Sequence, residues 1–169
     1  MTAQTTTQVD HAEIKMGQIL TVAISVTALV LQAQMPLIIL AVIFLLSGTA
    51  RPLSPFSMLY RWVISPLGIM KSDYRLDNIQ PHKFGQLVGV LTVVLALAFM
   101  QLGYPVAGWG IVAVLILLTV ISYAGWCIGC FIYYQLNRFG MGGFFKHAPT
   151  DKSIIMGMRP GKERNNIDR

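Results

Sequence analysis

The only two cysteines of the chain, Cys127 and Cys130, stand three residues apart in the stretch GWCIGC. This C-x-x-C spacing puts both sulfurs on one face of a helix, a geometry shared by thiol-disulfide exchange sites and by half of a tetrahedral zinc site. Zinc needs two more ligands, and the sequence contains no second C-x-x-C and no H-x-x-H. We therefore expect thiol redox or sulfur-transfer chemistry without a cofactor. Zinc shared between two protomers and two inert thiols that only pack are the alternatives.

The helix dipole sets a condition on this chemistry. At the carboxyl end of a continuous helix the dipole disfavours a thiolate, whereas a helix amino terminus favours one. If the helix breaks at Gly125 and a new one begins beside Cys127, the sequence continues as an amphipathic extension over residues 127–139, with Cys127 attacking and Cys130 resolving. The supporting cations expected near the thiolate are His82, Lys83 and Arg138.

The elements that must position these thiols are apolar runs of membrane length. The chain is 54% hydrophobic and 12% charged, which places it outside the soluble class. A spanning helix needs roughly 17–25 apolar residues. Four candidates follow at residues 17–33, 36–50, 84–103 and 106–126. Short turns join the first pair and the last pair, so we predict an all-α, integral membrane four-helix bundle. A re-entrant hairpin of the first two runs is the alternative.

Segments outside the spans complete the predicted organisation. Residues 1–16 are a polar N-terminal tail, residues 17–139 the four-span membrane domain, and residues 140–169 a basic cytoplasmic tail. Between the second and third spans, a serine followed by proline occurs at Ser54 and again at Ser65, and such pairs start helices. We expect two short interfacial helices within residues 54–70.

The positions of the basic residues predict the orientation of the protein in the membrane. All 13 Lys and Arg residues fall on one side of a four-span arrangement, and basic residues near the spans are retained in the cytoplasm. We therefore expect both termini in the cytoplasm. Attraction to anionic lipid headgroups, about 1 kcal/mol per basic residue near the surface, explains the basic surplus. The C-terminal tail lacks a basic helix with interleaved aromatics, which argues against nucleic-acid binding.

Two glycine pairs indicate where the spans pack. Gly85 and Gly89 form GxxxG at the cytoplasmic start of the third span, and Gly125 and Gly129 form it at the cytoplasmic end of the fourth. Glycines four apart let helix backbones approach closely in lipid. Because the two spans are antiparallel, we expect both pairs at the same depth, next to the cysteines.

Four sequence stretches together resemble a known family. They are VDHAEIKMGQ, RPLSPFSMLYR, PHKFGQ and GWCIGCFIYYQL, and over roughly residues 9–138 the chain resembles the bacterial integral-membrane family called domain of unknown function 4395. The family's P-x-x-F-A-Q element has Gly85 in place of its alanine. The resemblance implies a multi-pass protein of the bacterial inner membrane with a defined cysteine pair, and it implies no established activity.

Two functions of different class therefore remain open. The first is thiol-disulfide redox or sulfur handling at a cytoplasmic-facing C-x-x-C, with a thioredoxin-like or sulfurtransferase protein as the expected partner. The second is a non-catalytic accessory subunit of a larger membrane complex, in which the cysteines and glycines only pack helices. The lipid bilayer is a partner in both.

Overall fold

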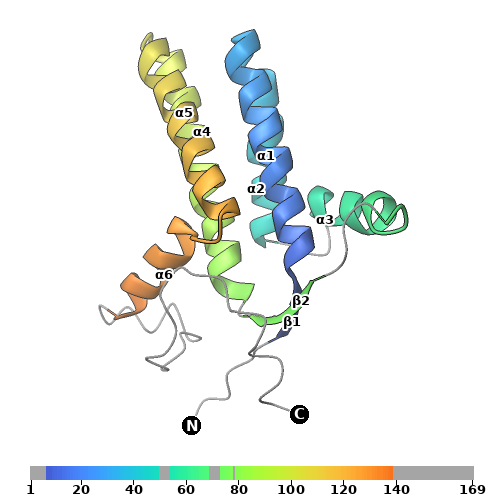
Figure 1. Cartoon of the computed structure of the whole chain (residues 1–169). Helices are drawn as coiled ribbons and strands as arrows, with labels where there is room; N and C mark the ends of the chain where they lie inside the picture. Colours follow the sequence, from blue (N-terminus) through green and yellow to red (C-terminus); the bar gives the residue numbers. More distant parts are fainter. Residues whose placement is uncertain (1–6, 50–53, 69–72, 78, 139–169) are drawn as a thin grey trace.

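The apolar runs fold into two antiparallel helical hairpins, seen in the computed structural model of the chain (Figure 1). The structure describes residues 7–49, 54–68, 73–77 and 79–138. The first hairpin pairs α1 (His11–Leu31) with α2 (Met35–Thr49), and the second pairs α4 (Ile79–Gln101) with α5 (Pro105–Tyr123). The four helices alternate in direction, so the start of α4 and the end of α5 lie at the same end of the molecule (Figure 1).

The two hairpin turns form where the sequence cannot continue a helix. Gln32 ends α1 in the left-handed conformation, with φ 50°, and its N–H donates to the carbonyl of Ala28. Gly103 adopts φ +86°, which only glycine takes without strain, and Pro105 then starts α5 with a φ already suited to a helix.

Among the described residues, three helices are long and apolar enough to cross a membrane, namely α1, α4 and α5. This indicates a membrane-embedded, mostly helical protein, as the composition predicted. The fourth helix, α2, is apolar but has only 15 residues. At 1.5 Å per residue it is about 22 Å long, against a hydrocarbon core of roughly 30 Å.

The helices bury small and branched side chains between them and leave large apolar ones outside. Ala28, Leu37, Leu40, Val93 and Ala96 are fully buried. Many large apolar side chains on the outer faces stay exposed, as expected for helices surrounded by lipid tails. The core members contributed by α5 are Val112 and Leu115.

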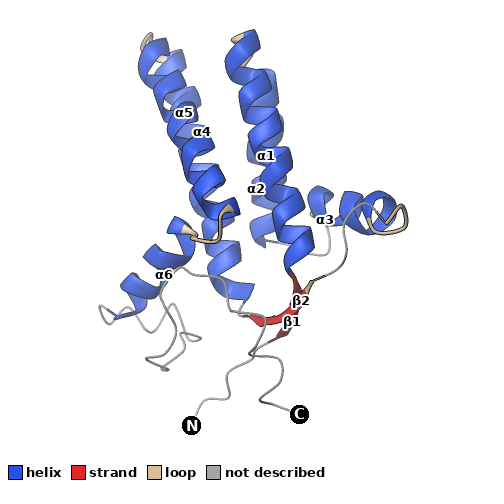
Figure 2. Ribbon diagram, viewed as in Figure 1, coloured by secondary structure: helices blue, strands red, loops and turns tan. Residues whose placement is uncertain are grey.

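A two-stranded antiparallel sheet, which the sequence analysis did not predict, lies beneath α1 (Figure 2). Strand β1 (Thr7–Asp10) pairs with β2 (Tyr74–Asp77), so residues 7–16, assigned above to a polar tail, form a strand and the start of α1. Asp10 ties these parts together. Its carboxylate accepts the N–H of Ala12 at 2.9 Å, which caps α1, and the N–H of Asp73 at 3.0 Å.

The connection between α2 and β2 differs from the prediction. Helix α3 (Pro55–Leu59) runs directly into a π-helical segment, η2 (Tyr60–Ile64), and the two form one continuous helical run. The second interfacial helix predicted to start at Ser65 is wrong within residues 65–68, which form a turn. The N–H of Ser65 donates back to the carbonyl of Tyr60 at 2.8 Å, and Gly68 with φ +66° then ends the helical path.

After α5 the chain leaves the bundle as α6 (Ile128–Arg138), which packs across the start of α4 (Figure 1). Helix α6 lies within residues 127–139, for which the sequence predicted an amphipathic extension, and residue 139 is outside the described part. The basic tail predicted for residues 140–169 also lies outside the described residues.

Candidate functional site

The helical path is interrupted between α5 and α6, just before the two cysteines. This is the interruption that the helix-dipole argument required. Helix α5 ends at Tyr123, Gly125 takes φ +118°, and α6 begins at Ile128. A φ of this sign strains any residue with a Cβ. The glycine therefore permits the sharp turn that makes Cys127 the first residue before a new helix.

Cys127 occupies the N-cap position of α6. Its Sγ accepts the backbone N–H of Cys130 at 3.4 Å, which is the bond that a capping side chain makes to the third residue of a helix. The amino end of a helix carries partial positive charge. The broken helix thus reverses the dipole that a continuous α5 would have presented to the sulfur.

Cys130 lies behind Cys127, against α4. The residue is only 6% exposed, and its Sγ is 3.9 Å from the Nδ1 of His82, within reach of a weak sulfur hydrogen bond. The ring of His82 in turn meets that of His11 edge to face, with 6.2 Å between centroids. Of the three cations expected near the thiols, His82 is therefore in place.

These surroundings lower the pKa of Cys127 from the ordinary value of a thiol to about 5. The largest cause is a hydrogen bond from the Cys130 side chain, and burial of the sulfur opposes it. The backbone N–H of Cys130, the charge of His82 and the hydroxyl of Ser122 lower it further. A thiol with such a pKa is ionised at neutral pH, and the thiolate is the nucleophilic form.

The packing beside the thiols depends on two glycines. A Cβ added to Gly129 would lie 2.7 Å from the Cα of Gly85, so the backbones of α6 and α4 touch there. Of the four glycines predicted to pack, Gly85 and Gly129 thus face each other. The outer members differ, because Gly89 faces the ring of Phe44 on α2 and Gly125 serves the turn instead.

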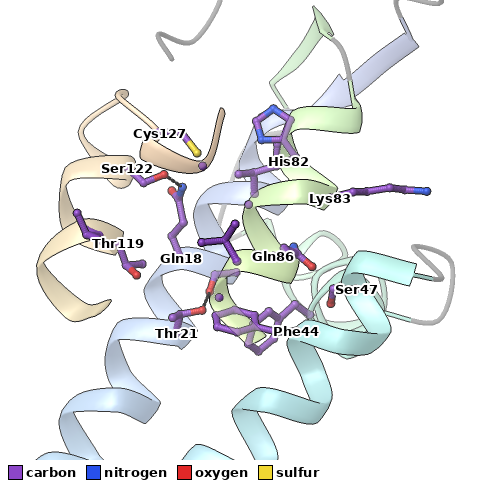
Figure 3. A pocket seen from close by; sticks show the side chains of 18 of the residues that line it. Gln18, Thr21, Phe44, Ser47, His82, Lys83, Gln86, Thr119, Ser122 and Cys127 are labelled. Atoms are coloured by element: carbon purple, nitrogen blue, oxygen red, sulfur yellow. Dashed lines mark hydrogen bonds between the residues drawn. The ribbon is translucent and has the colours of Figure 1, made fainter. Parts of the chain in front are cut away.

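The other two predicted cations are not brought to the sulfurs. Lys83 follows His82 directly on α4, and successive residues on a helix point about 100° apart. Its side chain extends away from Cys127 (Figure 3). Arg138 belongs to α6 by its backbone, and its side chain lies outside the described part of the chain.

Two site residues escaped the sequence analysis as contributors to the chemistry, Gln18 and Ser122. The Gln18 amide donates to the hydroxyl oxygen of Ser122 at 2.7 Å, and Ser122 reaches Cys127 (Figure 3). The signal was a glutamine inside an apolar helix, which is costly unless it has a partner. Ser122 lies five residues before Cys127, and only the turn at Gly125 brings the two together.

A cavity of about 200 Å³ opens from Cys127 into the bundle (Figure 3). Helices α1, α2, α4 and α5 all contribute to its wall. The apolar part of the wall includes Phe44, Phe56 and Leu115, and the polar part includes Gln18 and Gln86. The site thus joins a capped thiol to an internal space of the size of a small molecule.

The chain was compared with known proteins. Residues 9–138 match the family described as domain of unknown function (DUF4395). The chain belongs to this family. The match covers most of the chain and confirms the resemblance noted from the sequence. In this DUF4395 protein the matched residues run from β1 through both cysteines to the end of α6. No curated protein and no solved structure matches the chain.

Metal binding by this DUF4395 chain has no ready ligand set in the described part. There, no three His, Cys, Asp or Glu residues lie together in a way that could hold a metal ion. Zinc shared between two protomers therefore stays an untested alternative. The geometry that is present consists of a thiol pair, an imidazole and a chain of neutral hydrogen-bond donors.

Proposed function

We propose that the protein is a thiol-disulfide oxidoreductase of the bacterial cytoplasmic membrane. The observation that carries this proposal is the position of Cys127, whose sulfur caps the amino end of α6 beside His82 and on the wall of a cavity. An inert packing thiol needs none of these surroundings. A nucleophilic thiolate needs hydrogen-bond donors, positive potential and access, and all three meet at this sulfur.

The geometry supports a reversible two-step exchange. The Cys127 thiolate attacks one sulfur of a partner disulfide, and the electron pair of the broken bond leaves on the other partner sulfur. His82, once its ring is neutral, then takes the proton of Cys130, which attacks the Sγ of Cys127. The products are a Cys127–Cys130 disulfide and a partner dithiol, so two electrons have moved to the partner. A thioredoxin-like protein is the proposed partner, and persulfide transfer with a sulfurtransferase would use the same attacking sulfur.

The proposed topology has four spans with both termini in the cytoplasm. The turns at residues 32–34 and 102–104 carry no charge, whereas Lys15, Arg61 and Lys83 all belong to the end that holds the cysteines. Basic residues are retained on the cytoplasmic side. In this proposal α2 also spans, with the polar residues of the flanking turn reaching into the interface.

Labelling of whole cells tests this topology. In a Cys127→Ser, Cys130→Ser background, Tyr104→Cys and Trp62→Cys each place one thiol on an exposed position, at opposite ends of the bundle. A membrane-impermeant maleimide is expected to label Tyr104→Cys in intact cells and Trp62→Cys only after lysis. The reverse pattern would overturn the orientation.

The pH profile of alkylation tests the proposed chemistry. The rate for an ordinary thiol rises about tenfold per pH unit up to its pKa, near 8.5. For Cys127, with its pKa lowered to about 5, we expect a rate that is flat between pH 6.5 and 8.5. The shape of the profile is the measurement, because a thiolate of low pKa is also a weaker nucleophile and its absolute rate is no guide.

Two cysteine variants serve as controls for the alkylation measurement. Cys127→Ser keeps a capping oxygen for α6 and should remove the flat phase, while Cys130→Ser should retain a reactive thiol that can no longer form the internal disulfide.

The second candidate function, an accessory subunit that packs by its cysteines, is favoured by the backbone contact of Gly85 with Gly129. It requires both thiols to react only after denaturation, and that result would refute the oxidoreductase proposal.

A further inference from the structure

The cavity beside Cys127 has the size of a single ring. An apolar cavity of roughly 150 Å³ holds a benzene molecule, so about 200 Å³ leaves room for a ring with small substituents. Phe44 and Leu115, two core residues of the helical bundle, belong to its wall. The space beside the sulfur therefore fits a small molecule with an apolar ring.

The chemistry of the wall selects a neutral ligand with polar atoms. The deep lining combines apolar side chains with amides and hydroxyls, and the charged members sit at the end near the sheet. One of these charges is already neutralised, because Glu13 accepts a hydrogen bond from Ser57 and lies 3.8 Å from Arg61. An anion would have no counter-charge deep in this space, and it would pay the full cost of leaving water.

Gln86 adds a hydrogen-bonding group without a partner. Its Oε1 is buried and has no hydrogen-bond partner among the residues that the structure describes. An amide carries both a carbonyl acceptor and NH₂ donors. It can donate to the carbonyl of an oxidised ligand and accept from the hydroxyl of the reduced one. A buried acceptor without a partner is costly, which favours a ligand that supplies the missing donor.

We propose that this cavity binds the ring of a lipid-soluble quinone, which takes electrons from the Cys127–Cys130 dithiol, while the exchange described above runs in reverse and a partner dithiol reduces the disulfide again. The inference rests on the proposed oxidoreductase function and names its small-molecule substrate class. A quinone is planar and neutral, its reduced form supplies the hydroxyl donors that the Gln86 Oε1 lacks, and it dissolves in the membrane that the helices occupy. It is also the oxidant that the dithiol requires, since it accepts two electrons and two protons.

The step balances with the groups at the site. The Cys127 thiolate adds to a ring carbon, and the displaced electron pair moves to a quinone oxygen, which takes up a proton. Cys130 passes its proton to His82 and attacks Cys127, forming the S–S bond. The sulfur-carbon bond breaks, its electron pair returns to the ring, and the second oxygen is protonated. The dithiol is oxidised to a disulfide and the quinone is reduced to a hydroquinone.

A matched pair of threonines tests where the quinone binds. Thr119 lines the cavity, whereas Thr27 is exposed on the outer face of α1, and each hydroxyl bonds the carbonyl four residues back in its own helix. Thr119→Phe fills the cavity. Thr27→Phe makes the same chemical change, with the same lost hydrogen bond, on the lipid-facing side.

The assay is a single turnover with full-length protein in lipid nanodiscs. Reduced protein is freed of reductant and mixed without oxygen with decylubiquinone, whose fully substituted ring gives little direct reaction with free thiols. Hydroquinone formed and thiols lost are measured together. We expect one hydroquinone for each pair of thiols, a rate about a hundredfold lower in Thr119→Phe, as misplacement of a reacting group can cause, and an unchanged rate in Thr27→Phe.

The outcomes separate this inference from the function on which it rests. If the dithiol reduces a small soluble disulfide and Cys127 keeps its flat alkylation profile, but decylubiquinone is not reduced, the quinone site is refuted and the oxidoreductase remains. Equal loss of quinone reduction in both threonine variants also refutes the site. A Cys127 thiol that does not react in the native protein removes both proposals. Thr119→Phe is read only where its alkylation profile shows that the site has folded.

Discussion

Gly129→Ala should loosen α6 from the bundle, because the space for its methyl group is already filled by backbone. The added Cβ would lie 2.7 Å from the Cα of Gly85. Carbon atoms in contact are about 3.5 Å apart or more, so the two helices must separate by roughly 0.8 Å. No side chain can rotate away to relieve this contact. Overpacking of this kind costs about 1–3 kcal/mol of folding free energy.

The same separation should reach the chemistry. His82 and Gly85 lie on the α4 side of the contact, and Cys130 lies one residue after Gly129 on the α6 side. A shift of this size takes the Sγ of Cys130 beyond its present 3.9 Å from the His82 Nδ1. We expect a lower midpoint of thermal unfolding in detergent, by several degrees at about 2–4 °C per kcal/mol, together with slower formation of the Cys127–Cys130 disulfide.

Two further alanines are the controls for this prediction. A Cβ on Gly110 meets nothing within 4 Å, so Gly110→Ala should be neutral or raise stability, by up to about 1 kcal/mol from helix propensity. A Cβ on Gly85 would lie 3.9 Å from both the Cys127 Sγ and the Gly129 Cα, an ordinary contact, so Gly85→Ala should be tolerated. If Gly129→Ala unfolds at the same temperature as these two, α6 does not pack on α4 by backbone contact and the argument fails.

Three other predictions follow from single contacts. Gly125→Ala, at φ +118°, should lower the free energy of unfolding by about 1–2 kcal/mol through backbone strain and slow the alkylation of Cys127. Gly103→Ala, at φ +86° in the turn between α4 and α5, should lower it by as much and leave the alkylation rate of Cys127 unchanged. Equal alkylation rates in the two variants would contradict this. Cys130→Ala removes the largest contribution that lowers the pKa of Cys127, so the midpoint of its alkylation profile should move to higher pH; an unmoved midpoint would show another cause. Asp10→Ala removes the cap of α1 and should lower the free energy of unfolding by about 0.5–2 kcal/mol, measured by thermal unfolding. If Asp10→Ala destabilises the protein no more than an alanine substitution on the exposed surface does, Asp10 is not a cap.

The parts of the fold that follow from local sequence were predictable, and the parts that follow from tertiary contacts were not. Apolar runs and the turn residues Gly103 and Pro105 determined the membrane class and the second hairpin. The sheet of β1 with β2 was missed because its strands lie more than sixty residues apart and contain few apolar side chains. The turn at residues 65–68 was missed because a serine-proline pair permits a helix start but does not require one.

The candidate site shows the same division. From the sequence, a helix restart beside Cys127 was a condition of the redox interpretation, and Gly125 was the residue that could permit it. The sequence could not predict that His82 rather than Lys83 would lie beside the thiols, because this depends on which face of α4 meets α6. The roles of Gln18 and Ser122 depend on contacts between α1 and α5, and no local pattern in the chain relates them to the cysteines.

The packing of the glycines and the chemistry of the cysteines are parts of one arrangement. A thiolate near the end of a membrane span needs a helix amino terminus, yet a span that ends there presents its carboxyl terminus instead. The chain resolves this conflict by stopping α5, turning at Gly125 and starting α6 with Cys127 as its cap. The new helix can lie against His82 only if α6 carries no side chain at the contact, which is the condition that Gly129 meets. Close packing is thus required by the redox proposal as well as by its rival, and only the reactivity of the thiols distinguishes the two.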